Sequence, residues 1–508
     1  MMDPLREAAR RDPMGPGVEG ALAASGKMVT WSWADLDQLA DAAALRLSEA
    51  GVQGGDGVAI LLPPSPEAVV LLHAIPRAGA VCLPLNSGWT MAELARGLRA
   101  AGRPRLLLVP GGQVDALRRE LPQVGTVAVD EIVPVREEGE LLPADPRVRG
   151  AFPELTPDTP VAVLLTSGST GRPRPIPLTH GNLMASARAV SDRLRLDPMD
   201  RWMACLSPAH VGGLALLHRA TVVGSTIVTR PDFDPKEFLD LARVGELTHV
   251  SLVPVMLRRV LEAADGSPAP RGLRCVLLGG ARTPGPLLDE ALRRRWPISL
   301  TYGLTEASSQ VATAPPELVR ERPGSVGRPL SGVQVKVQGS QGGKAGDGVD
   351  GEILVRGPTV VLLPPHPSPG EGADATMRPS VYLGTDGWLH TGDLGRLDED
   401  GLLWVTGRRS DRIITGGVTV EPAEVEEVLL EHPGVSEVAV LGIPDAEWGQ
   451  RIAALVVPLD PDAPPGVEDL LAFASARLAR SRRPRALRII GSLPRNANGK
   501  VDRQRLEY

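Results

Sequence analysis

Short apolar runs alternate with amphipathic helical patterns along much of the chain between positions 33 and 278. Continuous apolar runs of four to six residues are typical of parallel strands that are buried on both faces, and the helices between them complete βαβ units. The pattern therefore predicts an α/β fold with parallel sheets. A helix is predicted over 36–50, and strands are predicted over 57–62, 80–84, 225–229, 249–253 and 275–278.

The pattern changes after Gly324. Glycines become frequent, helical patterns become rare, and strand-like runs appear at 333–337, 352–356 and 402–406. This combination favours a smaller antiparallel or barrel-like β unit. The Pro-rich stretch 364–379 is expected to be an exposed loop.

Short α/β units return after Gly407. We therefore predict a large N-terminal domain over 1–407 and a small α+β C-terminal domain over 408–508, with the charged segment 408–411 as the hinge. In the C-terminal domain, helices are predicted over 422–431 and 467–479, and strands over 435–442 and 486–490.

Composition supports a globular protein of more than one domain. The chain has 508 residues, 43% of them hydrophobic and 23% charged, and its net charge of -6 gives no basis for nucleic-acid binding. Cys82, Cys205 and Cys275 form no CxxC pair, which favours buried free thiols in a reducing compartment. No signal peptide or membrane-spanning run is apparent, so we expect a cytoplasmic protein without membrane insertion. The histidines show no zinc-ligand spacing.

The stretch 164–182, LLTSGSTGRPRPIPLTHGN, suggests a polyphosphate-binding loop. An apolar strand is expected to lead into a loop of small residues and then into a helix start. Glycines let backbone amides turn inward, and hydroxyls add donors around the same point. A flexible Gly/Ser linker is the alternative, although the flanking strand and helix argue against it. The phosphate-binding candidates are Thr166, Ser167, Gly168, Ser169, Thr170, Gly171 and Arg174.

Two further strand ends carry candidate nucleotide-binding residues. Gly279, Gly280 and Ala281 form a bare turn that a flat ring could approach. In the stretch from 300 to 310, Tyr302 next to Gly303 could stack on a base, and Glu306 is a hard oxygen ligand suited to Mg²⁺. A core tyrosine and a helix-start acid are the plain alternatives.

Two polar clusters lie further along the chain. Asp393 in WLHTGD could accept hydrogen bonds from both hydroxyls of a ribose, and Arg408 could donate to the sugar or to phosphate. Lys500, in PRNANGK, is one of only five lysines among 55 basic residues, which invites a specific role. A turn acid and a solvated tail lysine are the alternatives.

In this order, the clusters resemble the adenylate-forming superfamily of acyl-CoA synthetases, adenylation domains and luciferases. The matching segments are TSGSTGRPR, YGLTE, TGD, GRRSDRIITGG and PRNANGK, and the resemblance covers nearly the whole chain. It implies that ATP and Mg²⁺ activate a carboxylic acid as an acyl-adenylate with release of pyrophosphate. The thiol of coenzyme A then displaces AMP.

The resemblance also implies roles for individual residues. Lys500 would bridge the carboxylate and the phosphate, Thr305 would hold the α-phosphate, and Glu306 would hold Mg²⁺. Asp393 and Arg408 would hold the ribose. The small domain would swing about a hinge at Ser410, and would bring Gly416 and Gly417 to the thiol tunnel.

Within this superfamily, the segments PAHVGG, LLGGA and YGLTEASSQVAT are most similar to the o-succinylbenzoate–CoA ligases of menaquinone biosynthesis. This acid carries a second carboxylate, which needs a cation away from the reacting end. We assign that role to Arg219, with His210 near the pocket mouth and Ser309 on its wall.

Several positions depart from the family pattern. Arg174-Pro175 replaces a usual Lys-Gly, and Ala209 replaces an aromatic residue. Ser410 stands where the wider superfamily often has Asp or Lys, and 418–420 differs from the common Asn-Ile type. Other readings therefore stay open: a ligase for another aryl or medium-chain acid, an enzyme that loads a carrier protein, or a nucleotide-binding protein without turnover. The oligomeric state also stays open, with a homodimer as one option.

Overall fold

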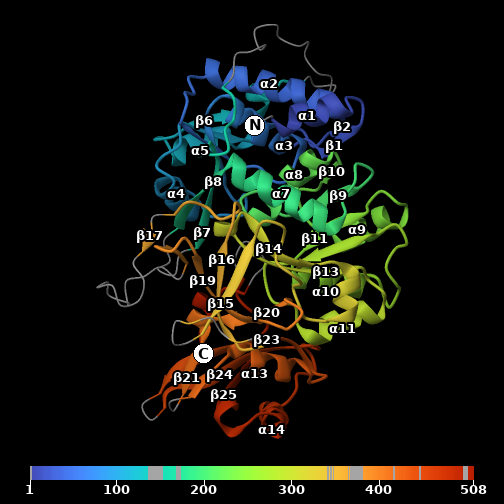
Figure 1. Ribbon diagram of the computed structural model, residues 1–508, viewed down its shortest axis with the longest axis vertical. Helices are drawn as coiled ribbons and strands as arrows, with labels where there is room; N and C mark the ends of the chain where they lie inside the picture. Colours follow the sequence, from blue (N-terminus) through green and yellow to red (C-terminus); the bar gives the residue numbers. More distant parts are fainter. Residues whose placement is uncertain are drawn as a thin grey trace.

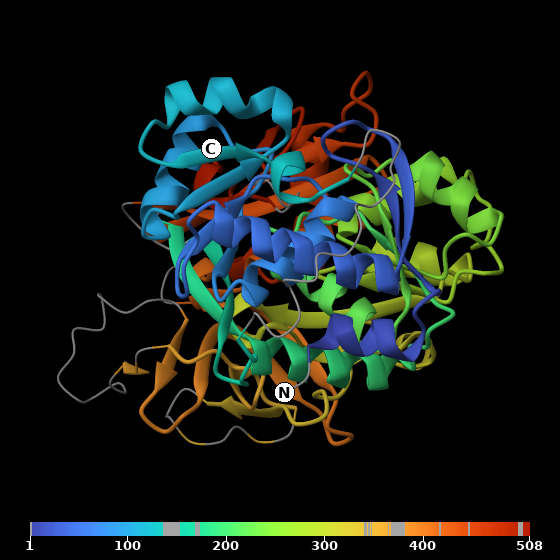
Figure 2. The ribbon, with the colours of Figure 1, turned by 90° about the horizontal axis from the view of Figure 1, so that it is seen from above.

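The computed structural model describes residues 3–135, 153–167, 173–339, 343, 346, 348–363, 365–366, 381–415, 418–445, 448–495 and 501–508. Three sheets form a large N-terminal part, and a fourth forms a separate C-terminal unit below it (Figure 1). Seen from above, the N-terminal helices lie in front of the C-terminal elements (Figure 2). Within the described residues, no helix is both long and apolar enough to cross a membrane.

The first sheet has six strands in the order β6-β5-β3-β4-β7-β8. Its strands are parallel except for the antiparallel pair β7–β8. The predicted strands 57–62 and 80–84 are confirmed as β3 and β4. The strands are β3 (Gly57–Ile60), β4 (Val81–Pro84), β5 (Leu106–Val109), β6 (Gly125–Ala128), β7 (Pro160–Ser167) and β8 (Pro173–Thr179).

The strand β8 was not predicted, because the sequence pattern indicated a loop of small residues that leads into a helix start. The order of strands explains this error. β8 is at the edge of the sheet, where alternate residues need no backbone donor, so Pro173, Pro175 and Pro177 fit there. The helix α7 (His180–Leu194) follows at once, capped by Thr179.

The second sheet has eight strands in the order β14-β13-β12-β11-β9-β10-β1-β2. Its central strands are parallel, as predicted, and one apolar cluster packs on each face. The strands are β1 (Pro16–Ala21), β2 (Met28–Ser32), β9 (Arg201–Ala204), β10 (Thr226–Thr229), β11 (His249–Leu252), β12 (Cys275–Leu278), β13 (Ile298–Leu304) and β14 (Ser309–Ala314).

Helices cover both sheets. The predicted helix 36–50 is confirmed as α2, which begins three residues earlier because Ser32 and Asp35 form a capping box. The helices are α1 (Pro4–Arg11), α2 (Trp33–Glu49), α3 (Pro66–Arg77), α4 (Met91–Ala100), α5 (Val114–Glu120), α6 (Val129–Ile132), α8 (Val211–Val223), α9 (Pro235–Arg243), α10 (Pro254–Ala263), α11 (Gly285–Arg293) and α12 (Pro316–Glu321).

The third sheet is the predicted β unit, and most of its pairs are antiparallel. Its order is β15-β16-β19-β18-β17, with β20 also paired to β19. The predicted loop 364–379 lies outside the described residues except for 365–366. The strands are β15 (Gln334–Gln338), β16 (Gly351–Arg356), β17 (Pro365–His366), β18 (Tyr382–Gly384), β19 (Leu389–Leu397) and β20 (Leu403–Arg408).

The C-terminal unit has its own apolar core and a five-stranded sheet. The predicted boundary falls where β20 ends, and the 3₁₀ turn η5 (Arg409–Asp411) connects β20 to the unit. Its elements are β21 (Ile413–Thr415), β22 (Val418–Val420), α13 (Pro422–Leu430), β23 (Val435–Asp445), β24 (Gly449–Pro458), α14 (Val467–Arg477) and β25 (Ala486–Ile489).

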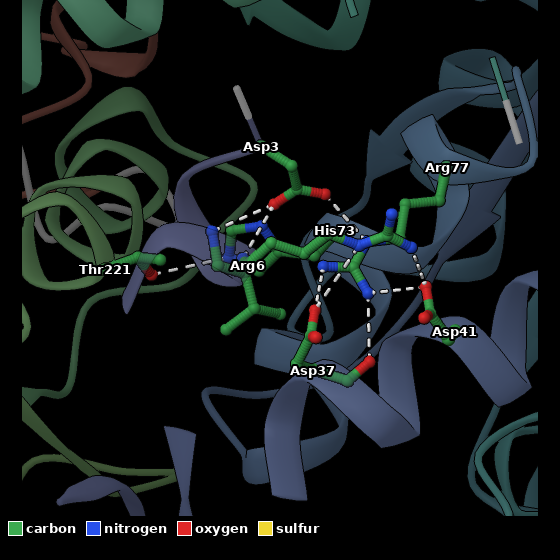
Figure 3. A network of polar contacts seen from close by, with 8 residues as sticks. Asp3, Arg6, Asp37, Asp41, His73, Arg77 and Thr221 are labelled. Atoms are coloured by element: carbon green, nitrogen blue, oxygen red, sulfur yellow. Dashed lines mark hydrogen bonds and ion pairs between the residues drawn. The ribbon is translucent and has the colours of Figure 1, made fainter. Parts of the chain in front are cut away.

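A buried ion-pair network fastens the N-terminal helix to the core (Figure 3). The guanidinium of Arg77 lies 2.7 Å from Asp3, 2.5 Å from Asp37 and 2.8 Å from Asp41. Burial alone would raise the pKa of Asp3, but the charge and hydrogen bond of Arg77 lower it well below its usual range. The network therefore fixes α1 against α2 and α3.

Candidate active site

Neighbouring strand ends form the base of the site. β12 pairs in parallel with β13, so the turns that follow them meet at the same edge of the sheet. Gly280 has a φ of 79°, and a Cβ on Gly279 would lie 2.8 Å from Cγ2 of Thr301. A side chain at position 279 would therefore collide with Thr301 on β13, and the positive φ of Gly280 favours glycine there. Binding of a flat ring at this turn stays a prediction.

Gly303 cannot be replaced without a backbone change. A Cβ there would lie 1.8 Å from the carbonyl oxygen of Ser309, where β13 and β14 shift register. The close approach folds 305–307 into the 3₁₀ turn η3 (Thr305–Ala307). Ser309 follows with a φ of 109° and opens β14 as a buried residue.

Tyr302, Asp393 and Arg408 meet in a hydrogen-bonded group. The hydroxyl of Tyr302 donates to Oδ2 of Asp393 over 2.8 Å, and Nε of Arg408 donates to Oδ1 over 2.7 Å. The antiparallel register of β19 and β20 places Asp393 opposite Arg408. The carboxylate raises the pKa of Arg408, while burial, followed by the charge of Asp393, raises the pKa of Tyr302. Asp393 is therefore an anchored acceptor with lone pairs to spare.

Glu306 lies in the electrostatic field of this group. Its side chain is buried, and burial raises its pKa although the cations Arg174 and Arg408 favour the charged form. Arg174 is held by a 2.8 Å hydrogen bond from Nη1 to the carbonyl of Val381. Among the described residues, no three acidic, histidine or cysteine side chains form a metal cluster. Glu306 could therefore hold a metal only together with phosphate oxygens or water.

Part of the predicted site lies outside the described residues, and local contacts place two of the other candidates. Thr166 is the second-last residue of β7, and its hydroxyl donates to the carbonyl of Arg174 over 3.4 Å. The hinge candidate Ser410 is in η5 and donates to Asp411 over 3.0 Å. Only the backbone of Ser167 is described. Gly168, Ser169, Thr170, Gly171, Gly416, Gly417 and Lys500 lie outside the described residues.

His210 immediately precedes α8 and faces the other sheet. Its Nε2 lies 3.1 Å from Nδ2 of Asn86, which follows β4. Asn86 was not singled out in the sequence, although its place two residues after a strand end was a signal. The pair joins the segment after β4, in the first sheet, to the start of α8.

Arg219 lies nine residues further along the chain, within α8, and its side chain is buried. Its guanidinium carbon is 4.7 Å from the ring centre of Trp202, and its Nη1 is buried with no hydrogen-bond partner among the described residues. Burial lowers the pKa of Arg219 to about 10, so the group is still a cation at neutral pH. No contact joins it to Tyr302, Asp393 or Arg408 in the described structure. It is an uncompensated buried charge.

Polar groups missed in the sequence lie on the same face of the sheet as Trp202. Trp202 pairs in register with His249, and alternation along β11 places Ser251 on this face, nearer the strand end. The register with β12 and β13 adds Ser299 to the same face. The hydroxyls of Ser251 and Ser299 are buried without a partner among the described residues. Only strand register could reveal this polar strip.

A separate cavity of about 310 Å³ lies at the opposite edge of the second sheet, where the strands begin. It is lined by Arg193, His249 and Arg274, among others. Arg193 and Arg274 already bind protein carbonyls or carboxylates. None of the predicted site residues lines it, so we do not assign it to the active site.

Family models match the chain over most of its length. The model of the AMP-binding enzyme matches residues 5–362, and that of the AMP-binding enzyme C-terminal domain matches residues 424–500. The 2-succinylbenzoate–CoA ligase of Bacillus cereus is 36% identical over 460 residues, which cover 91% of this chain and 89% of that protein. The enzyme of the same name from Bacillus licheniformis is 35% identical over 467 residues, covering 91% of each chain.

Solved structures of o-succinylbenzoate CoA synthetase (MenE) from Bacillus subtilis share the fold at 32% identity. The complex with the acyl-adenylate OSB-AMP has a TM-score of 0.84 and covers 100% of this chain and 98% of that one. The complex with ATP and magnesium scores 0.83, with 99% of each chain covered. A double mutant with the product analogue OSB-NCoA scores 0.69, with 100% and 98% covered. The chain belongs to the AMP-binding, adenylate-forming enzyme family.

Proposed function

We propose that this protein is an AMP-forming acid–CoA ligase that converts o-succinylbenzoate to its CoA thioester. The named relatives and the OSB-AMP complex support this activity. The observation that carries the choice of acid is the buried, unpartnered Nη1 of Arg219. A buried cation without a counter-ion is costly, and the second carboxylate of a dianionic acid would supply one.

In the first step, a carboxylate oxygen attacks the α-phosphorus of ATP. A new P–O bond forms, the bond to the β-phosphate oxygen breaks, and pyrophosphate leaves. The negative charge that gathers at the α-phosphate needs fixed cations and donors. Lys500 and Thr305 would act there, Asp393 would hold the ribose, and Glu306 would hold Mg²⁺, which offsets charge on the phosphates when bound.

In the second step, the sulfur of CoA attacks the acyl carbonyl and AMP leaves with the electron pair of the broken C–O bond. The protein's contribution is to orient the thiol, and the family resemblance places Gly416 and Gly417 along its approach. The departure at Arg174 keeps a positive charge at the site, so this residue could still contact phosphate. The small side chain of Ala209 would open the acid pocket or alter the approach of the thiol.

The acid would lie beneath α8, with its reacting carboxylate toward Thr305 and its second carboxylate toward Arg219. The nine helical steps from His210 to Arg219 rise about 13 Å, enough for an aryl dicarboxylate. Ser251 and Ser309 would line the path between them. A cytoplasmic location, a homodimer and dependence on magnesium are further predictions for the purified protein.

The test is pyrophosphate release with ATP and Mg²⁺ across o-succinylbenzoate, benzoate, other aryl acids and fatty acids, with and without CoA. We expect o-succinylbenzoate to have the highest kcat/KM and to yield its CoA thioester. If another acid has the highest kcat/KM, the role assigned to Arg219 is wrong, but the proposed ligase reaction is not contradicted. ATP binding without pyrophosphate release for any acid would contradict enzymatic activity altogether.

A further inference from the structure

The two parts of the chain touch at a second place besides the hinge. Nη1 of Arg258, on α10, donates to the carbonyl of Ser436 over 2.5 Å and contacts its hydroxyl at 2.9 Å. Nη2 of Arg282 lies 2.9 Å from Oε2 of Glu427, on α13. We call these two contacts, Arg258–Ser436 and Arg282–Glu427, the latch.

The latch lies at the same edge of the second sheet as the nucleotide-binding residues. α10 begins directly after β11, and Arg282 is the residue that follows the 279–281 turn. The fit is close here, since a Cβ on Gly285 would lie 3.4 Å from Oε1 of Glu427. The C-terminal unit is therefore fastened to the turn that is predicted to hold the base.

The arrangement that contains the latch matches one state of the Bacillus subtilis protein better than another. The TM-score is 0.84 for the OSB-AMP complex and 0.69 for the double mutant with OSB-NCoA, at the same identity and coverage. Because the aligned sequence is nearly the same in both, the two structures differ in arrangement. The latch is thus a property of the arrangement that resembles the acyl-adenylate complex.

We propose that the latch holds the C-terminal unit in the arrangement that makes the acyl-adenylate, and that it opens before CoA reacts. The inference rests on the proposed function, and it makes Arg258 and Arg282 positioning residues that act through the C-terminal unit. Contacts present in one arrangement and absent from another shift the population toward the first. Arg258 is half-buried and makes charge-assisted bonds, so it contributes more than the exposed pair of Arg282.

The experiment separates the two half-reactions. Adenylation is measured as a single turnover of pyrophosphate release without CoA, and thioester formation is measured from supplied OSB-AMP and CoA. Arg258→Ala should slow adenylation about tenfold and leave thioester formation as fast as in the wild type or faster, because one charge-assisted bond is worth about a factor of ten. Arg259→Ala is the matched control, since Arg259 lies on the exposed side of the same helix.

The ion pair allows a charge-swap test. Arg282→Glu and Glu427→Arg should each slow adenylation roughly threefold through like-charge repulsion, and the double variant should recover wild-type speed. These side chains are exposed, so all three proteins are expected to fold. An equal fall in both half-reactions, no change in either, or failure of the swap to restore speed would overturn the proposal.

A readout without the acid separates this inference from the proposed function. With ATP and Mg²⁺ present, trypsin should cut at the hinge arginines 408–412 faster in Arg258→Ala than in Arg259→Ala, with sites identified by mass spectrometry. Equal rates contradict the latch. If the wild type prefers a different acid, the proposed function is wrong. The latch is then tested by measuring adenylation and thioester formation with that acid.

Discussion

Arg219 combines a cost to stability with a proposed role in binding. Its charge is buried against Trp202 and lacks a carboxylate partner in the described structure. Replacing such a group with an apolar side chain of similar size removes a desolvation penalty. The same change removes the counter-ion for the second carboxylate of the acid.

We therefore predict that Arg219→Leu keeps or raises the free energy of unfolding, by up to about 1 kcal/mol, while it raises the KM for o-succinylbenzoate about 100-fold. The KM for ATP should change less than about threefold, because Arg219 makes no contact with the described residues proposed to bind ATP. Urea unfolding and steady-state kinetics measure both effects. Equal effects on the two KM values would exclude the assigned role.

Lys500 gives a second prediction at this scale. Lys500→Ala should lower adenylate formation at least about 1,000-fold, because the cation acts on charge that develops at the α-phosphate. Thioester formation from supplied OSB-AMP should stay near the wild-type rate. Loss of both half-reactions would contradict the assigned role, and Lys500→Arg serves as the charge-conserving control.

At the scale of elements, α1 is stabilised by polar contacts more than by the helix propensity of its residues. Asp3 caps the first turn and also pairs with Arg77, and α1 in turn packs on the core through Leu5 and Ala8 (Figure 3). A helix of eight residues is not stable alone. The docking of α1 therefore depends strongly on the carboxylate of Asp3.

We predict that Asp3→Asn destabilises the protein by about 1–3 kcal/mol at pH 7, since Asp37 and Asp41 still compensate Arg77. Glu7→Gln, an exposed change on the same helix, should be near neutral. The pKa of Asp3 is lowered on folding, so its stabilisation is present above the unfolded value of 3.8 and is lost as the pH falls toward the folded value. Thermal unfolding of both variants between pH 7 and pH 3 checks the size and the sign.

Helices and strands were predicted correctly where the pattern of apolar residues matches the period of the element. They were missed where an element depends on its place within a sheet. The apolar runs of β11 and β12 were found within one residue. β8 was missed because its prolines are acceptable only on an edge strand, and which strand lies at the edge is not a local property. The same holds for the strip that contains Ser251, which appears only once strands are paired.

At the scale of the whole molecule, the hinge should control which half-reaction proceeds. Ser410 is in the 3₁₀ turn between β20 and β21, where the φ of proline can be accommodated. Ser410→Pro should keep adenylation within about threefold of wild type and slow thioester formation more than about tenfold, because a stiffened hinge resists rearrangement. Ser410→Ala should leave both rates unchanged. Slower adenylation with normal thioester formation would contradict the predicted hinge.

The sequence by itself determined the α/β fold class, because the period of hydrophobic residues along the chain is a local property. It also predicted two domains and a set of nucleotide-binding residues, because short motifs are local as well. It also supplied the family, through five motifs in order. Only the tertiary structure decided that Asp393 binds both Tyr302 and Arg408, that Arg219 is buried on Trp202, and that Arg258 reaches Ser436. These contacts join residues far apart in the chain, and their distances depend on strand register and on how the C-terminal unit packs.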